Sequence, residues 1–523
     1  MMSRVNPWTK WLFVGVACLP TALSAASDDA STVMTPEQVK EDFDLAVKVV
    51  EAGLPDTTWF QSERAWRLAK EEAHQALPGI EDAQGLFRTL RPLLSRIGEG
   101  HLALHRSPAM KRMDRQGQGL LPLDIHWTEG GAWIERGWGD AAFISPGTRL
   151  LAIDGETADD LVRESMAALG HDGRIATGAM REAGGAGYAK VRYWMRGGAR
   201  HYRLRLQDAA GAINEMVVAG MPASARPAQT ASEESPLARL EWLDGRTARL
   251  VVPTFSNRRY REAGSDYQAV IGQLFETLRE RGARNLILDL RSNGGGSEGN
   301  ENYLFSYLVR DPIRKYASVE ARDASLSVAD RQGRLYSVEV FDKQELATQE
   351  RLPNGHLSRR NEPPEGLMSH WERRSPVFDG RLIVLAGGET FSGAAELSSM
   401  LYHVQRGLFV GEEVAGAHAG NTSGYTWEVR LPNSGMVLHV PLLKFRFAWD
   451  DLPLGRGVPP HCAVPPDLPG TSRDSALEAA YSLTLMPWTV ADPPACPMHG
   501  SDRATGPWHD DAGYRVLPRS AGR

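Results

Sequence analysis

The sequence predicts an α/β fold built around a mostly parallel sheet. Two short apolar runs carry this prediction, residues 285–296 (NLILDLRSNGGG) and 381–397 (RLIVLAGGETFSGAAEL), and each ends in glycines or other small residues. Continuous apolar runs bounded by turn signals are typical of strands that are buried on both faces. Strands also alternate with helical patterns through this half of the chain, which implies crossover connections between parallel strands.

Local signals place the remaining elements in chain order. Thr35, Pro36 and Gln38 form the capping-box pattern of a helix start. Helical periodicity continues in two more stretches, and from about residue 120 to 206 short strands alternate with glycine-rich turns. The expected helices are 62–76, 83–97, 159–169, 267–281 and 393–404, and the expected core strands are 249–255, 285–290, 382–386 and 408–410.

Composition limits the class of protein. A chain of 523 residues with 42% hydrophobic content is long enough for two or three domains with cores of their own. The net charge of −6 gives no basic footprint, so we expect no nucleic-acid partner. No segment after the N-terminal one approaches the roughly 20 apolar residues of a transmembrane helix.

The N-terminus is typical of a secretory leader. Arg4 and Lys10 precede a short apolar run at 11–19 and small residues at 22–26. We predict a signal peptide at 1–26 and a periplasmic or secreted protein. Lipid anchoring through Cys18 is the less favoured interpretation, because Gly15 fits a lipobox poorly.

Two cysteines remain beyond the leader, Cys462 and Cys496. In an oxidising compartment they can pair and tie the proline-rich tail to the core, and the alternative is two free thiols. The sequence leaves both open. Neither cysteine has a CxxC partner, so we expect no structural zinc.

The two glycine-marked runs resemble the S41 serine peptidases, the family of the C-terminal processing and tricorn-type proteases. The family strand pattern DLRxNxGG matches residues 289–295, and its nucleophile turn TFSxAxE matches residues 390–396. Further similar motifs follow in the same order, at 411–416, 420–424, 431–435 and 455–458. The resemblance covers about 237–466 and, more loosely, the region before it.

The resemblance implies a ClpP/crotonase-like catalytic core with an N-terminal helical part and a PDZ-like β domain. Residues 144–155 (ISPGTRLLAIDG) and the helix after them look like part of a PDZ module, which captures extended peptides by strand addition. A β insert without a ligand role is the alternative. The expected divisions are 1–26 signal peptide, 27–115 helical domain, 116–220 PDZ-like domain, 221–236 linker, 237–490 catalytic core and 491–523 tail.

Ser392 is the predicted nucleophile. It follows a buried strand and opens a helix, where free backbone N–H groups and the helix dipole favour developing negative charge. A plain helix cap is the alternative role for such a serine. The amides of Gly393 and of Gly294 or Gly295 are the predicted oxyanion donors, since glycines let the backbone approach a substrate.

The general base is assigned by the resemblance. The Ser–Lys branch of the family has its lysine about 25 residues after the serine. It does not fit here, because position 417 is Ala417 and no lysine occurs between Ser392 and Lys444. The tricorn-type branch uses a histidine before the PDZ domain, and residues 94–104 (LSRIGEGHLAL) are similar to its signature. We therefore expect His101 to be the base, with His418 as the rival candidate.

The acid that would orient the imidazole is the weakest match. The family's late glutamate pattern appears as residues 454–461 (LGRGVPPH), without an acid at its usual places. Asp450 and Asp451 lie just upstream and are the candidates to replace it, with solvated loop charges as the alternative.

These observations predict an exported serine endopeptidase that acts on peptide or protein substrates without a cofactor. A catalytically inactive protein that binds a peptide or hydrophobic ligand is the second hypothesis, and a crotonase-like acyl transferase or thioesterase is the third. Assembly into a homo-oligomer is compatible with the sequence and is not specified by it.

Overall fold

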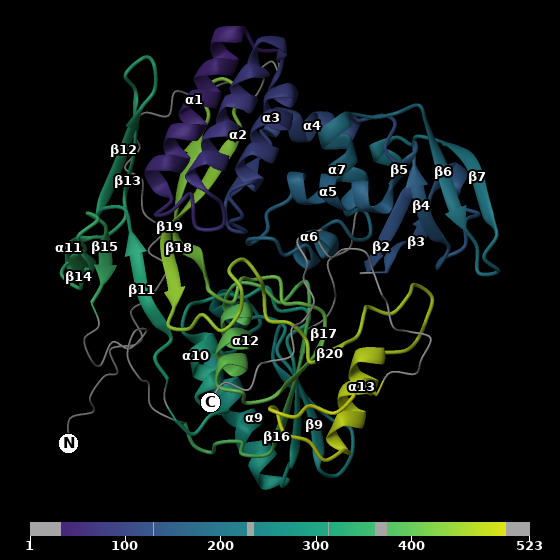
Figure 1. Cartoon of the computed structure of the whole chain (residues 1–523), viewed down its shortest axis with the longest axis vertical. Helices are drawn as coiled ribbons and strands as arrows, with labels where there is room; N and C mark the ends of the chain where they lie inside the picture. The colour runs from purple at the N-terminus through teal and green to yellow at the C-terminus, as the bar shows by residue number, and fades with distance from the viewer. Residues whose placement is uncertain (1–32, 129, 227–234, 312, 361–373, 498–523) are drawn as a thin grey trace.

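The computed structural model describes residues 33–128, 130–226, 235–311, 313–360 and 374–497. The predicted leader at 1–26 and residues 498–523 of the predicted tail lie outside these ranges. Three parts of the chain are distinguishable in Figure 1: a group of N-terminal helices, a β-rich unit beside them, and a larger α/β core. Within the described ranges, no helix combines the length and the apolar character needed to cross a bilayer.

The N-terminal section is helical and is completed by one short strand. The Thr35 side chain accepts from the Gln38 amide, and the Gln38 side chain accepts from the Thr35 amide, so the predicted capping box is formed. The elements are α1 (Pro36–Gly53), α2 (Glu63–Gln75), η2 (Leu77–Gly79), α3 (Ala83–Ser95), β1 (Ala103–His105) and α4 (Pro108–Gln116).

This section has no hydrophobic core of its own. Its buried residues, such as Val49 of α1 and Leu90 of α3, belong to the same apolar cluster as Leu286 and Val384 of the core. Strand β1 pairs antiparallel with a core strand, Leu104 opposite Leu438. The predicted helical segment at 27–115 is therefore packed into the core, and its boundary at residue 115 stays a prediction.

The β-rich unit has a separate hydrophobic cluster, which spans Leu121 to Val218. Its main sheet has the strand order β2-β3-β4-β6-β7, with β5 beside β4. We call residues 116–220 the β-domain. Its elements are β2 (Leu123–Thr128), β3 (Gly131–Gly137), η3 (Gly139–Ala141), β4 (Arg149–Ile153), β5 (Glu156–Thr157), α5 (Ala158–Ala168), α6 (Thr177–Glu182), α7 (Gly187–Arg196), β6 (His201–Gln207) and β7 (Ile213–Ala219), followed by η4 (Ala223–Ala225).

The core contains the predicted mostly parallel sheet, in the order β20-β17-β16-β10-β9-β8 with only β8 antiparallel. Alternate residues of β10 serve two layers: Leu286 and Leu288 face the main cluster, and Ile287 faces a cluster that includes α13. The elements are β8 (Arg239–Trp242), β9 (Thr247–Val251), α8 (Asn257–Glu262), α9 (Tyr267–Glu280), β10 (Asn285–Asp289), α10 (Asn300–Phe305), β16 (Arg381–Ala386), α12 (Gly393–His403), β17 (Leu408–Gly411), β20 (Cys462–Ala463) and α13 (Ser475–Thr484).

A second, antiparallel sheet joins the core to the N-terminal helices. Its long strand β19 pairs with β18 on one edge and with β1 and β11 on the other. The sequence analysis assigned no strands here. The elements are β11 (Tyr316–Ala321), β12 (Ser325–Ala329), β13 (Leu335–Glu339), α11 (Lys343–Leu346), β14 (Gln349–Arg351), β15 (Leu357–Arg359), β18 (Gly420–Arg430) and β19 (Val437–Phe447), of which β12 and β13 form a separate hairpin.

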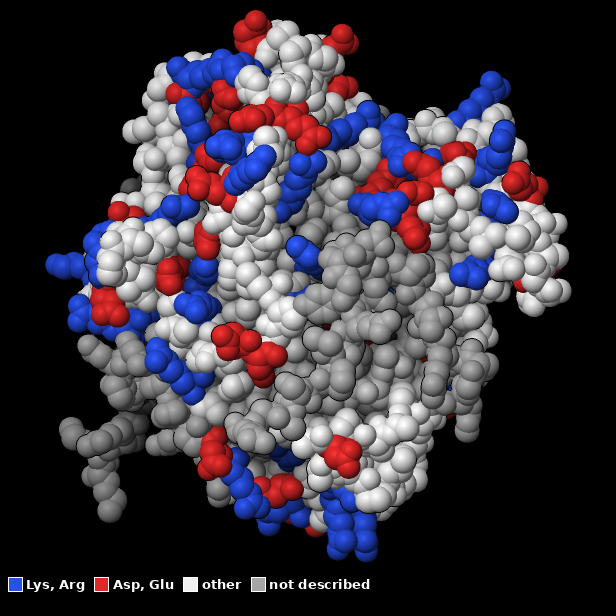
Figure 2. Space-filling view, viewed as in Figure 1, with Lys and Arg blue, Asp and Glu red and all other residues white. Residues whose placement is uncertain are grey.

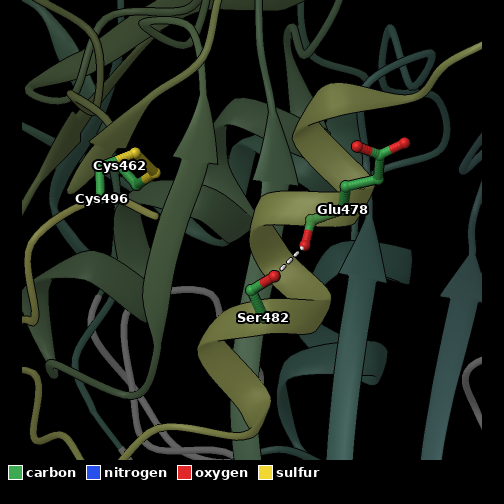
Figure 3. The surroundings of a disulfide bond; sticks show 4 residues. All are labelled: Cys462, Glu478, Ser482 and Cys496. Atoms are coloured by element: carbon green, nitrogen blue, oxygen red, sulfur yellow. Dashed lines mark hydrogen bonds between the residues drawn. A yellow bond between two sulfur atoms is a disulfide. The ribbon is translucent and has the colours of Figure 1, made fainter. Parts of the chain in front are cut away.

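Cys462 and Cys496 form a disulfide, with 5.0 Å between their Cα atoms. This resolves the alternative that the sequence left open. Figure 3 shows the bond beside α13, where Ser482 donates to the Glu478 carbonyl. The bond ties the end of the described chain to β20 at the edge of the parallel sheet.

Charges of both signs are interspersed over the face shown in Figure 2, where basic side chains lie among acidic ones on the helices and the β-domain. Many of them form surface ion pairs, such as Arg196 with Glu156 at 2.6 Å. Isolated exposed pairs of this kind contribute little to stability.

Candidate active site

Ser392 lies at a strained turn between β16 and α12. Its backbone has φ 51° and ψ −127°, a region that non-glycine residues seldom occupy and that is often found at active sites. Two hydrogen bonds of Thr390 fix the turn. Its hydroxyl donates to the Leu290 carbonyl at 2.9 Å and accepts from the Gly387 amide at 3.0 Å. The Ser392 side chain makes no capping hydrogen bond to α12, so the helix-cap alternative has no support.

His101 meets Ser392 from the N-terminal section. The Nε2 atom of its ring lies 3.2 Å from the Ser392 hydroxyl, across 291 positions of sequence. The ring also stacks on Phe391, with 4.7 Å between centroids and an angle of 29° between the planes. Since β1 begins two residues later and pairs with β19, the histidine loop is anchored on the core sheet.

The environment of His101 keeps its imidazole neutral. Burial lowers its pKa to about 4, and the negative charge of Glu396 opposes this shift only in part. A neutral imidazole can accept the proton of a serine hydroxyl, which a protonated ring cannot.

The glycine turn after β10 packs directly against the serine turn. Gly295 has φ +94°, and a Cβ atom on it would lie 2.7 Å from the Ser392 Cβ and 2.8 Å from the Gly393 nitrogen. The Gly295 amide donates to the Asn293 side chain at 2.8 Å, so that donor is committed to the turn. Of the three predicted oxyanion donors, the amides of Gly294 and Gly393 are the two that this bond leaves as candidates.

The structure corrects the prediction that Asp450 or Asp451 orients His101. Asp451 accepts from His418 Nε2 at 2.6 Å and lies 3.5 Å from His403 Nδ1. Burial favours the neutral form of Asp451, but its hydrogen bonds with these two histidines outweigh burial and hold its pKa far below the usual range. Asp450 is exposed to solvent.

Helix geometry explains why these residues miss the serine. His403 ends α12, whereas Ser392 precedes its first residue, so the two lie about 16 Å apart along the axis at 1.5 Å per residue. His418 belongs to the same far end, because its ring packs on Tyr402 with 5.6 Å between centroids. His418 is thus placed away from Ser392. Among the described residues, no protein atom bonds the Nδ1 atom of His101.

A buried ionic cluster joins α12 to neighbouring segments of the core. Lys315 is fully buried and pairs with Glu301 at 2.8 Å and with Glu396 of the nucleophile motif. Glu396 also accepts from Tyr316 at 2.8 Å and from Asn421 at 2.9 Å. Burial acts to raise the pKa of Glu396, but Lys315 outweighs it and keeps the pKa low, so this carboxylate stays charged and fully bonded.

Asp289 and Arg291 of the DLR motif brace the end of β10. Asp289 accepts from Arg249 at 2.6 Å and from Arg291 at 2.7 Å, and Arg291 also pairs with Asp474 at 2.7 Å. This network fixes the strand end from which the glycine turn departs.

Sequence reasoning missed two residues of the site. Phe391 stood inside the quoted nucleophile motif, but an apolar residue there gives no sign that it stacks on a distant histidine. Asp172 belongs to the β-domain and bonds the backbone on both sides of the Ser392–His101 pair, as described below. No local pattern around Asp172 signals this contact.

No group of three or more His, Cys, Asp or Glu side chains in the described ranges is arranged to hold a metal ion. A cavity of about 660 Å³ lies at the N-terminal ends of the parallel strands, near the start of β10 and β16 and away from the Ser392 turn. Two of its lining arginines donate to backbone carbonyls: Arg381 to Thr484 at the end of α13, and Arg406 to Phe378 and Gly380 before β16. These arginines satisfy exposed carbonyls, a structural role.

The fold and the site together define a hydrolase of the serine type, in which a strained serine faces a neutral imidazole beside a glycine-lined turn. Residues 246–464 match the model described as Peptidase family S41, so the core of this chain is that of an S41-family peptidase. It is therefore a serine-type peptidase, which acts on peptide or protein substrates. The match includes Ser392 and the glycine turn, and it does not extend to His101.

Solved structures give similar folds at low sequence identity. The crystal structure of mature CPAF aligns with a TM-score of 0.57 at 15% identity and covers 82% of this chain and 93% of that one. Mature CPAF complexed with lactacystin aligns at 0.54 and 14%, with 82% and 94% covered. The photosystem II D1 C-terminal processing protease gives 0.41 and 16%, with 86% and 97% covered. A comparison with curated proteins finds no match.

Proposed function

We propose that this chain is an exported serine endopeptidase in which Ser392 attacks the peptide bond and His101 is the general base. The observation that carries the proposal is the 3.2 Å separation between His101 Nε2 and the Ser392 hydroxyl, formed by two segments 291 residues apart. A nucleophile and a base within hydrogen-bond reach are the geometric signature of an activated serine.

The first half of the reaction forms an acyl-enzyme. Ser392 Oγ attacks the scissile carbonyl carbon while its proton moves to His101 Nε2. The carbonyl oxygen becomes an oxyanion, which the Gly393 and Gly294 amides stabilise at the N-terminus of α12. The C–N bond then breaks, and the proton on His101 passes to the leaving amine.

The second half regenerates the enzyme. Water attacks the acyl carbon and gives one proton to His101, the ester bond to Ser392 breaks, and His101 returns the proton to the serine oxygen. The products are an amine and a carboxylic acid. Phe391 stacks on the face of the imidazole and holds the plane of the ring through both halves, without replacing the bond that a triad acid makes to Nδ1.

Export to the periplasm or to the outside is part of the proposal. Its support is the leader pattern at residues 1–26 and the pairing of Cys462 with Cys496, which suits an oxidising compartment. Capture of an extended peptide by strand addition to the PDZ-like β-domain, the absence of nucleic-acid partners and assembly into a homo-oligomer stay predictions from the sequence.

Labelling with a fluorophosphonate probe and turnover of casein test the proposal, with wild type compared with Ser392→Ala. We expect the variant to lose labelling and to lose turnover by about 10⁴-fold or more. Ser482→Ala is the matched control, because that serine only bonds within α13. Equal labelling of wild type and Ser392→Ala would refute the assignment of the nucleophile.

The unpartnered Nδ1 atom of His101 favours one alternative, a protein that keeps the fold and binds a peptide or hydrophobic ligand without cleaving it. Tight peptide binding by wild type, with neither labelling nor turnover, is the result that this alternative requires. Turnover of thioesters in place of peptides would point to the third hypothesis, an acyl transferase or thioesterase.

A further inference from the structure

One carboxylate of the β-domain contacts both halves of the active site. Asp172 lies between α5 and α6 and is fully buried. Its Oδ1 accepts the Gly100 amide at 2.7 Å, next to His101. Its Oδ2 accepts the Ala417 amide at 3.1 Å, in the loop that precedes β18.

The second of these loops lies against the nucleophile. A Cβ atom on Gly416 would lie 3.7 Å from the Ser392 nitrogen and 3.8 Å from Asp172 Oδ2. Asp172 therefore holds the backbone beside His101 with one oxygen and the backbone beside Ser392 with the other.

The chain around Asp172 is built for close backbone approach. The Gly173 amide donates to the Gly98 carbonyl at 2.9 Å, and the Arg174 amide donates to the Gly455 carbonyl at 2.9 Å. A Cβ atom on Gly173, which has φ +53°, would lie 2.3 Å from the Gly455 Cα. Only glycine fits here, so residues 170–174 are wedged between the His101 loop and the loop at 453–457.

The two bonds of Asp172 account for the position of the His101 ring relative to Ser392, which the side chains of the site do not explain. No acid bonds His101 Nδ1 in the described part of the chain, and stacking on Phe391 fixes the ring plane but not its advance toward the serine. Two charge-assisted hydrogen bonds from one buried carboxylate fix the distance between the two loops.

We infer that Asp172 is a positioning residue for peptide hydrolysis: by bonding the Gly100 and Ala417 amides together, it sets the approach of His101 to Ser392 and makes the β-domain a structural part of the active site. The inference rests on the proposed function of Ser392 and His101. Asp172 touches neither substrate nor the reacting atoms and acts only through the two loops.

The charge state of Asp172 is sensitive to pH. Burial raises its pKa to about 6, against the two backbone hydrogen bonds, which favour the charged form. The titratable or charged groups on the segments packed around it are Glu99 and His101 on one loop, His418 and Arg456 on two others, and His171 and Arg174 beside it. Glu99 faces Asp172, and burial together with that carboxylate raises the pKa of Glu99 well above its usual value.

The raised pKa of Asp172 predicts different pH dependences for activity and for stability. Asp172 must be ionised to accept both amides, so activity is present above pH 6 and falls as the pH drops through about 6. A carboxyl whose pKa is raised on folding stabilises the fold in its protonated form, and this stability is lost as the pH rises through about 6. Activity and the contribution of Asp172 to stability therefore change in opposite directions over the same range.

The test compares wild type, Asp172→Asn and the control Asp140→Asn, an exposed aspartate of the same domain. Asparagine keeps the size of the side chain but accepts only one amide and turns two N–H donors toward the other. We expect kcat on a fluorogenic peptide to fall on the order of 100-fold in Asp172→Asn, with KM little changed. The melting temperature should fall by only a few degrees, since one buried amide loses its acceptor. Asp140→Asn keeps wild-type kcat.

The pH profile of kcat/KM gives the second measurement. Wild type should show an acid limb near pH 6 from Asp172 and a further loss near pH 4 from His101, while Asp172→Asn keeps only the loss near pH 4. Unchanged kcat in Asp172→Asn, or a wild-type profile without the limb near pH 6, would overturn the inference. Failure of the proposed function is distinguishable, because wild type itself would then show no labelling or turnover that depends on Ser392.

If Asp172→Asn does not fold, the wild-type profile decides alone. Loss of kcat/KM near pH 6 with an unchanged or higher melting temperature supports the positioning role. Loss of activity that accompanies unfolding over the same range contradicts it.

Discussion

The imidazole rings of His101 and His418 lie toward opposite ends of α12, and they differ in what each ring contacts. His418 has the acid partner, since Asp451 bonds its Nε2 at 2.6 Å and also approaches His403. His101 has no acid partner but has the serine, at 3.2 Å from its Nε2. An acid–histidine pair, the feature that usually marks a triad, is here found at the end of the helix away from the nucleophile.

This contrast indicates that hydrogen bonds to the backbone of a histidine loop can take the place of an acid bonded to the imidazole. The His101 loop is held through the Gly100 amide by Asp172 and through β1 by β19, and its ring is held by Phe391. The His418 loop instead begins beside Ser392 at Gly416, and the His418 ring packs on Tyr402 and bonds Asp451 toward the C-terminal end of α12. The His101 imidazole is thus held next to the serine, and the His418 imidazole is held away from it.

The largest expected difference between the two histidines is in kcat, when each is replaced by glutamine. We expect His101→Gln to lower kcat by about 10²–10⁴-fold, the usual contribution of a general base, with KM little affected. His418→Gln should leave kcat within about threefold, because His418 lies at the far end of α12, although its loss of the Asp451 bond should cost about 1–3 kcal/mol of stability. Steady-state kinetics on a fluorogenic peptide and thermal unfolding measure the two effects.

The reverse result would exchange the roles of the two loops. A large loss of kcat in a well-folded His418→Gln protein, with His101→Gln close to wild type, would mean that the Asp451–His418 pair moves to the serine during turnover. The labelling rate with a fluorophosphonate separates this from damage to substrate binding, since the small probe needs only an activated serine.

The next largest loss of kcat is expected from a substitution in the glycine turn beside Ser392. In Gly295→Ala the new Cβ would press on the Ser392 Cβ at 2.7 Å and on the Gly393 nitrogen at 2.8 Å, at a φ of +94°. We expect kcat to fall on the order of 10²-fold, comparable with the loss of one oxyanion donor. Gly294→Ala is the matched control, because nothing lies within 4 Å of its Cβ and its amide is retained.

Kinetics and melting temperatures of the two alanine variants distinguish a displaced serine from a weakened turn. If Gly295→Ala keeps wild-type kcat, the close approach of the two turns does not matter for the chemistry. If Gly294→Ala is the more damaged, its methyl group meets the substrate beside the amide that is already assigned as an oxyanion donor.

The sequence predicted the parts of this site that are written into local patterns. Continuous apolar runs located β10 and β16, and the small residues after them located the glycine turn and Ser392, because buried parallel strands and tight turns leave strong local signals. The family resemblance then located His101. The boundaries of α9 and α12 differ from the structure by one residue each.

The parts that were missed depend on contacts between distant segments. Asp451 is close in sequence to the family's acid position, yet its partner is set by where the chain after β19 meets α12, and no local pattern records that. Asp172 bonds amides 72 and 245 positions away, and backbone amides have no sequence signature. The β18–β19 pair was also overlooked, since its motifs were matched to a family without being assigned strands.

The smallest effect on activity is expected from the disulfide, which belongs to the His418 side of the molecule. Cys462 follows His461, whose Nδ1 accepts the Phe409 amide at 3.0 Å and whose ring packs 5.6 Å from Tyr402. In Cys462→Ser combined with Cys496→Ser, the closed loop of the denatured state is released, which costs about 3–4 kcal/mol for a separation of 34 residues. We expect a lower melting temperature and a kcat/KM equal to wild type below that temperature. Chemical unfolding of the double variant and of reduced wild type measures the first quantity, and peptide turnover measures the second. Because the bond lies next to His461, which packs on Tyr402 near the end of α12, a loss of turnover in the folded double variant would show that the two ends of the helix are coupled in catalysis.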